Sequence, residues 1–124
     1  MPKTKEKDYA KPANTFINQG MTLLAEQMHG SESVRIDGLY MGNVNLEGYL
    51  QVGETGRIEG NIQVSYALIA GVIEGDILCR ANVHLASTAK VVGDISTGRI
   101  IIDEGAVLYG MCKTRDNEAE IVVV

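Results

Sequence analysis

The sequence predicts an all-β protein, a parallel β-helix in which about six coils of three short strands stack on one another. Three observations predict this fold. Hydrophobic residues make up 45% of the 124 residues, but aromatic residues only 5%. Glycine is frequent in the part of the chain where proline is absent, and one short motif recurs about every 17 residues.

The composition favours a core built in thin, repeated layers. With one Phe and no Trp, the core must consist of many Val, Ile and Leu side chains. Both prolines, Pro2 and Pro12, lie near the start, whereas 12 of the 14 glycines lie between Gly38 and Gly110. Such a chain turns often while keeping the backbone N–H groups that a hydrogen-bonded ladder needs.

The recurring motif is a glycine flanked by apolar residues two positions before and two positions after it. The glycine spacings are 18, 15, 18 and 17 residues. Alternation with a period of two is typical of a β-strand with one buried face. The five units are Tyr40-x-Gly42-x-Val44, Ile58-x-Gly60-x-Ile62, Ile73-x-Gly75-x-Ile77, Val91-x-Gly93-x-Ile95 and Leu108-x-Gly110-x-Cys112.

A unit of this length is too short for a pair of helices, since helical repeats need about 33–47 residues. At ~3.3 Å per residue, 17 residues give a contour of roughly 56 Å, enough for three short strands and their corners. Each unit also contains a second apolar pair that belongs to another strand of the coil. These pairs are Leu50/Val52, Ala67/Ile69, Val83/Leu85 and Ile100/Ile102.

The polar residues that follow the motif glycines predict how the corners are capped. Asn43, Asn61, Asp76 and Asp94 each follow such a glycine. Short amide and carboxylate side chains accept hydrogen bonds from nearby backbone N–H groups. We therefore expect these side chains to cap the exposed amides of the corners, and not to bind Ca²⁺, since each unit offers one acidic or amide group only.

The chain divides into three parts. Residues 1–14 are Lys-rich and polar and are expected to be a disordered tail, residues 15–112 form the β-helix, and residues 113–124 form a C-terminal tail. Residues 16–30 fit the repeat less well, because Ala25 stands where a glycine is expected. We interpret this segment as a degenerate first coil; the alternative is a short amphipathic helix that covers the end of the stack.

From Arg35 to Lys113 the sequence resembles the bactofilin family, polymer-forming cytoskeletal proteins of bacteria. The resemblance rests on an ordered series of motifs: Ile36-Asp37-Gly38, Leu50-Gln51-Val52-Gly53, Gly60-Asn61-Ile62, the stretch from Leu85 to Ile95 (LASTAKVVGDI), Ile102-Asp103-Glu104-Gly105-Ala106 and Gly110-Met111-Cys112-Lys113.

The resemblance implies a right-handed triangular β-helix that assembles without nucleotide into non-polar filaments. It further implies a cytoplasmic scaffold that supports cell shape, polarity or motility by localising partner proteins, including proteins of wall synthesis. Many members carry a short hydrophobic membrane-targeting segment at the N-terminus. Residues Met1 to Thr15 are charged instead, so we expect membrane contact, if any, to run through partners.

A stack of coils ends in two faces with unpaired backbone groups above an apolar interior, and such edges pair with other chains unless they are covered. No proline, charge run or helix covers the last coil before Lys113. The sequence therefore predicts polymerisation surfaces at both ends. The candidates are Leu108, Tyr109, Met111 and Cys112 at the C-terminal face, and Phe16, Ile17, Met21, Leu23, Leu24 and Met28 at the N-terminal face. The alternative is that residues 113–124 fold back over the C-terminal face.

Several function classes fit the sequence less well. No segment has the basic surplus that nucleic acid requires, and no nucleotide-binding glycine loop occurs. A left-handed hexapeptide-repeat acyltransferase, which forms trimers, also uses about 18 residues per coil. It needs a catalytic His or a zinc site, but His29 and His84 are the only histidines, and His84 is expected to point outward. Cys79 and Cys112 are expected to be buried, reduced thiols. We expect no catalytic residue, metal or cofactor; a non-polymerising β-helix adaptor remains the third interpretation.

Overall fold

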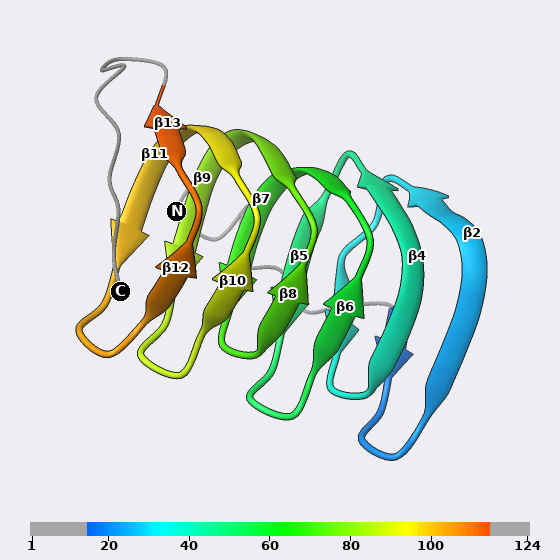
Figure 1. The fold of residues 1–124 in the computed structure, drawn as a ribbon. Helices are drawn as coiled ribbons and strands as arrows, with labels where there is room; N and C mark the ends of the chain where they lie inside the picture. The colour runs from blue at the N-terminus through cyan, green and yellow to red at the C-terminus, as the bar shows by residue number, and fades with distance from the viewer. Residues whose placement is uncertain (1–14, 115–124) are drawn as a thin grey trace, which may run out of the picture.

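A computed structural model describes residues 15–114 of the chain. This range forms one 13-stranded sheet, wound into a stack of about six coils, and contains no helix (Figure 1). The fold class and the number of coils predicted from the sequence are therefore confirmed. The strands are β1 (Thr15–Ile17), β2 (Thr22–Gly30), β3 (Val34–Ile36), β4 (Leu39–Leu46), β5 (Tyr49–Val52), β6 (Arg57–Glu59), β7 (Ile62–Ile69), β8 (Val72–Glu74), β9 (Ile77–Leu85), β10 (Lys90–Val92), β11 (Ile95–Ile102), β12 (Val107–Tyr109) and β13 (Cys112–Thr114).

The stack has three faces, and each strand pairs in parallel with its equivalent in the next coil. Face A contains β6, β8, β10 and β12 together with the first parts of β2 and β4. Face B contains the second parts of β2 and β4, the first parts of β7, β9 and β11, and β13. Face C contains β1, β3 and β5 and the second parts of β7, β9 and β11.

The inward side chains form continuous aliphatic columns along the stack. On face A the column joins Tyr40, Ile58, Ile73, Val91 and Leu108, all of them buried. Each fully buried aliphatic side chain contributes roughly 1.5–3 kcal/mol. Tyr40, the one aromatic member, donates its hydroxyl to the Asn43 carbonyl oxygen at 2.7 Å, which satisfies its polar end inside the core.

The 15-residue unit is shortened at two places, by two residues at the turn from face C to face A and by one at the corner between faces B and C. Residues 53–56 link β5 to β6, and residues 86–89 link β9 to β10. Between β7 and β8 only Ala70 and Gly71 intervene, so this coil is shorter without any loss of strand pairing. The remaining missing residue lies within β7, where its register against β9 shifts between Val64 and Tyr66.

The corner between faces A and B holds a column of glycines. Gly42, Gly60, Gly75, Gly93 and Gly110 all have positive φ, between 143° and 156°. A Cβ added to Gly75 would lie 2.0 Å from the carbonyl oxygen of Gly60, one coil earlier. The same clash recurs along the column, because successive coils are separated by one strand spacing. Only glycine fits this corner.

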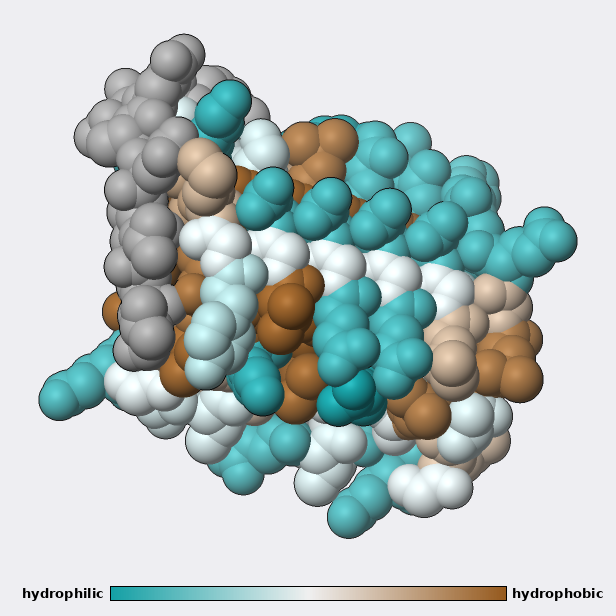
Figure 2. All heavy atoms as spheres, viewed as in Figure 1, coloured by the Kyte–Doolittle hydropathy of each residue, from teal (hydrophilic) through white to brown (hydrophobic). Residues whose placement is uncertain are grey.

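Beside the glycines runs a ladder of capping side chains, as the sequence predicts. The Oδ1 atoms of Asn43, Asn61 and Asp76 each accept a hydrogen bond from the backbone N–H of the equivalent residue one coil later, at 2.9–3.0 Å. Asp94 completes the ladder by accepting from the Met111 N–H at 3.1 Å. These residues form a hydrophilic row along the stack (Figure 2).

Residues 16–30 form a degenerate first coil, so the helical alternative is wrong. β1 pairs with β3, and β2 pairs with β4 over its whole length except at Ala25 and Glu26, where the register shifts. This is the corner at which the later coils carry glycine. Without that glycine, the chain passes the corner through an irregularity in the ladder.

The glycine column can be tested by substitution. Replacing Gly75 with Ala introduces a Cβ at positive φ against the Gly60 carbonyl oxygen, so we expect the free energy of unfolding to fall by about 2–3 kcal/mol. Gly30→Ala is the matched control, because its Cβ would meet only Leu46 Cδ2 at 3.9 Å. Thermal denaturation followed by circular dichroism measures both; equal melting temperatures would contradict the steric account.

Candidate assembly surfaces at the two ends of the stack

The C-terminal end of the stack is formed by the second part of β11 with β12 and β13. Within residues 15–114, β12 pairs only with β10, and β13 pairs only with β11. The segment Arg99–Ile102 of β11 pairs only with β9. In the described part of the chain, these segments therefore form the last coil, with ladder partners on one side.

The four residues predicted for this end point in two directions. Leu108 and Cys112 point inward and are 1% and 0% exposed, so they complete the core columns of faces A and B. Tyr109 and Met111 point outward and are 51% and 43% exposed. The alternation that identified the strands already assigns them these opposite orientations.

The Tyr109 ring is held by a residue of the preceding coil. The Lys90 ammonium lies 5.8 Å from the ring centroid, in the position of a cation–π contact. Lys90 and Val107 are partners in the ladder between β10 and β12, which places the lysine beside the ring. The contact orients the aromatic side chain at the rim of the last coil.

Sequence reasoning missed two contributors to the C-terminal end. Ile100 and Ile102 belong to the inward column of face C, but in the last coil they are only partly buried against the core. Their equivalents one coil earlier, Val83 and Leu85, are 0% exposed. Their place in the last unit of the repeat was the signal that could have identified them.

The N-terminal end is formed by β1 and β2, which within residues 15–114 pair only with β3 and β4. Four of the predicted residues are exposed apolar side chains: Phe16 (56%), Met21 (55%), Leu23 (42%) and Leu24 (67%). Of the other two, Ile17 points into the core and Met28 packs partly buried against it. Hydrophobic side chains gather at the end of the molecule that carries β2 (Figure 2).

The remaining candidate groups sit elsewhere. Both cysteines are free and buried, and burial raises the pKa of the Cys79 and Cys112 thiols. His84 points outward on face C, as predicted, and its Nε2 lies 3.0 Å from an Asp103 carboxylate oxygen. Within residues 15–114, no group of three or more His, Cys, Asp and Glu residues is placed to hold a metal ion. None of the described segments is a helix long and apolar enough to cross a membrane.

Comparison with known proteins shows which family this chain is similar to. A family model described as bactofilin, polymer-forming cytoskeletal, matches residues 15–113. The chain is 35% identical over 98 residues to the bactofilin BacO of Myxococcus xanthus, and 30% identical over 105 residues to BacP of the same organism. These matches cover 79% and 85% of this chain, and 77% of BacO but only 43% of BacP. The chain is also similar to the crystal structure of a mutant bactofilin from Thermus thermophilus, with 31% sequence identity and a TM-score of 0.65. This structural match covers 72% of this chain and 98% of the Thermus chain.

The inward orientation of the two cysteines can be tested by thiol labelling. Burial disfavours the reactive thiolate and blocks access, so we expect Cys79 and Cys112 to react with a disulfide reagent at pH 8 only after denaturant is added. The control is Ser96→Cys, because Ser96 is exposed on face B. Labelling of Cys112 at the rate of the new cysteine would contradict its place in the core column.

Proposed function

Because this chain belongs to the bactofilin family of polymer-forming cytoskeletal proteins, we propose that it assembles end to end, without nucleotide, into non-polar filaments. We further propose that these filaments act in the cytoplasm as a scaffold that supports cell shape, polarity or related morphogenesis. In this proposal the scaffold localises wall, polarity or motility proteins, and it reaches the inner face of the membrane through such partners.

The observation that carries the proposal is the chemistry of the two ends. Each terminal coil presents strands with a ladder partner on one side within residues 15–114, together with exposed or half-buried apolar side chains. Joining two ends buries these side chains and can extend the backbone ladder from one subunit to the next. The interactions are of the kind that hold the coils of one chain together, so no nucleotide is required to form them.

The corner of the first coil supports a non-polar arrangement. A head-to-tail joint that continued the ladder would place the first coil of one subunit on the last coil of another, with Ala25 above Gly110. At every internal joint from Gly60 to Gly110, that position holds a glycine, because a Cβ would lie 1.9–2.1 Å from a carbonyl oxygen. The corner at Ala25 and Glu26 is irregular and does not repeat the geometry of these joints. Like-to-like contacts, each related by a two-fold axis, avoid this mismatch and yield a filament without polarity.

The C-terminal surface can be tested with a charge. We expect Met111→Glu to weaken assembly, because a carboxylate buried at a joint without a partner costs at least ~2 kcal/mol, or about thirtyfold in the association constant. Sedimentation and negative-stain electron microscopy measure the filaments. Leu108 is unsuitable for this test, since it is 1% exposed and a charge there would disrupt the coil itself.

The matched control for this variant is Leu78→Glu. Leu78 resembles Met111 in exposure, since Leu78 is 49% exposed on face B and Met111 is 43% exposed near the same face. Leu78, however, lies in the middle of the stack. We expect filaments of normal yield from this control. Filaments that survive Met111→Glu, or that are lost equally in both variants, would remove the C-terminal end from the mechanism.

Polarity gives a second, independent prediction. In a non-polar filament the two ends make separate contacts, so Met111→Glu leaves the N-terminal contact intact, and we expect a discrete dimer of twice the 13.4 kDa chain mass. Adding Leu24→Glu, at the 67% exposed leucine of the N-terminal end, should give monomers. Size-exclusion chromatography with light scattering distinguishes the species. Monomers from Met111→Glu alone would indicate a head-to-tail filament, and monomers of the unmodified chain would indicate an adaptor.

A further inference from the structure

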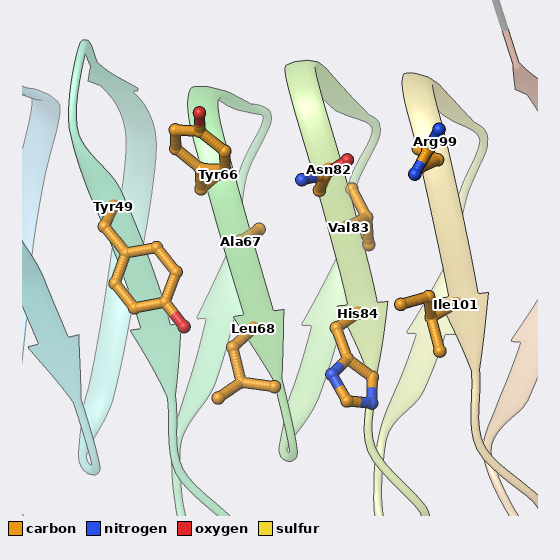
Figure 3. A pocket seen from close by; sticks show the side chains of 9 residues that line it. All are labelled: Tyr49, Tyr66, Ala67, Leu68, Asn82, Val83, His84, Arg99 and Ile101. Carbon is orange, nitrogen blue, oxygen red and sulfur yellow. The ribbon is translucent and has the colours of Figure 1, made fainter. Parts of the chain in front are cut away.

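Face C carries a groove that filament formation through the ends does not use. It has a volume of about 300 Å³ and crosses β5, β7, β9 and β11. Figure 3 shows its outward side chains on four neighbouring strands. The lining includes Tyr49, Tyr66, Leu68, His84, Arg99 and Ile101.

The ladder register arranges these side chains in two rows that run along the stack. Tyr49, Tyr66, Asn82 and Arg99 are successive partners in one row, and Leu68, His84 and Ile101 in the next. The two tyrosine rings are 6.5 Å apart and tilted by 58°. Ile101 is 53% exposed although its neighbours Ile100 and Ile102 point inward. The groove is thus aromatic at the β5 side, has the His84 imidazole between Leu68 and Ile101 along its floor, and carries Arg99 at β11.

Carboxylates stand at the aromatic side of the groove. Glu32 and Glu47 are exposed and line a smaller hollow together with Tyr49 and Tyr66. A cation placed here meets two carboxylates and aromatic faces, whereas an anion is favoured at the far side by Arg99. The groove is therefore bordered by carboxylates near β5 and by Arg99 at β11, where the Asp103 carboxylate also lies 3.0 Å from His84 Nε2.

We propose that this groove binds residues 1–14 of the same chain in an extended conformation. The chain enters the fold at Thr15 on β1, which is the first strand of face C. Five strand spacings of ~4.8 Å separate β1 from β11, about 24 Å, whereas 14 extended residues reach roughly 46 Å. The segment is therefore attached at the correct face and is long enough to span the whole groove.

Two residues of this segment, Lys11 and Tyr9, reach groups in the groove that suit them. Going back from Thr15 at ~3.3 Å per residue, Lys11 reaches the level of β5 and β7, beside Glu32, Glu47 and the tyrosines. Tyr9, which lies on the same side of an extended chain as Lys11, reaches β9, over the floor that includes Leu68. Pro12 lowers the entropy that an extended segment loses on docking.

Carbodiimide cross-linking of the full chain, followed by mass spectrometry, tests the proposal. We expect Lys11 to cross-link to Glu32 and Glu47 on the order of tenfold more than to Glu54 and Asp76, because docking raises the local concentration of the paired groups. Glu54 and Asp76 are exposed carboxylates at the other two corners. Equal yields at all four carboxylates would overturn the proposal.

Matched variants locate the docking site. Leu68→Asp places a charge on the groove floor, and we expect it to lower the Lys11 cross-links several-fold, whereas Leu78→Asp on face B leaves them unchanged. Tyr9→Ser changes none of residues 15–114, so it should have the effect of Leu68→Asp even if the latter unfolds. Unchanged cross-links in Tyr9→Ser would overturn the proposal, as would equal losses in the two leucine variants.

An equal mixture of ¹⁴N- and ¹⁵N-labelled chains, assembled together, identifies which chain supplies the segment. Cross-links within one isotopic form support docking on the same chain. Cross-links of which about half join the two forms would show that a second copy occupies the groove, and would overturn the proposal.

Discussion

One distance governs this molecule, the single strand spacing of about 4.8 Å between successive coils. The backbone ladder sets it on all three faces, and no side chain can widen it at one corner without breaking pairs at another. At the corner between faces A and B the spacing leaves no room for a Cβ above the preceding carbonyl, so glycine recurs from Gly42 to Gly110. Along the faces it brings equivalent side chains into contact, so each column is filled with aliphatic residues.

Because the constraint repeats, much of the fold could be predicted from the sequence. The glycine motif gave the strand period, its recurrence gave the coil, and the asparagine and aspartate residues after it were identified as caps, which the ladder from Asn43 to Asp94 confirms. The degenerate first coil was also recognised, although its corner lacks glycine. These features repeat in sequence because each coil must meet the same neighbour.

What does not repeat could not be predicted. The short turn at Ala70 and Gly71 is visible only as a 15-residue spacing, which does not say where residues are missing. The outward side chains of face C are not restricted to aliphatic residues as the inward columns are. The sequence pattern therefore does not show that Tyr49, Tyr66, Leu68 and Ile101 meet in one groove, which follows only from the register of four strands. The end residues were selected by position in the chain, which mixes inward Leu108 with outward Tyr109.

The same spacing makes the ends different from the sides. Inside the stack every coil has two neighbours, and the cost of ordering a coil is offset by contacts on both of its surfaces. A terminal coil has a neighbour on one surface only, which leaves Ile100 and Ile102 partly exposed where Val83 and Leu85 are fully buried. A second subunit at that surface would give the last coil the surroundings of an internal one. Assembly would then stabilise the coil that is least supported within a single chain, so folding of the ends and filament growth are expected to be coupled.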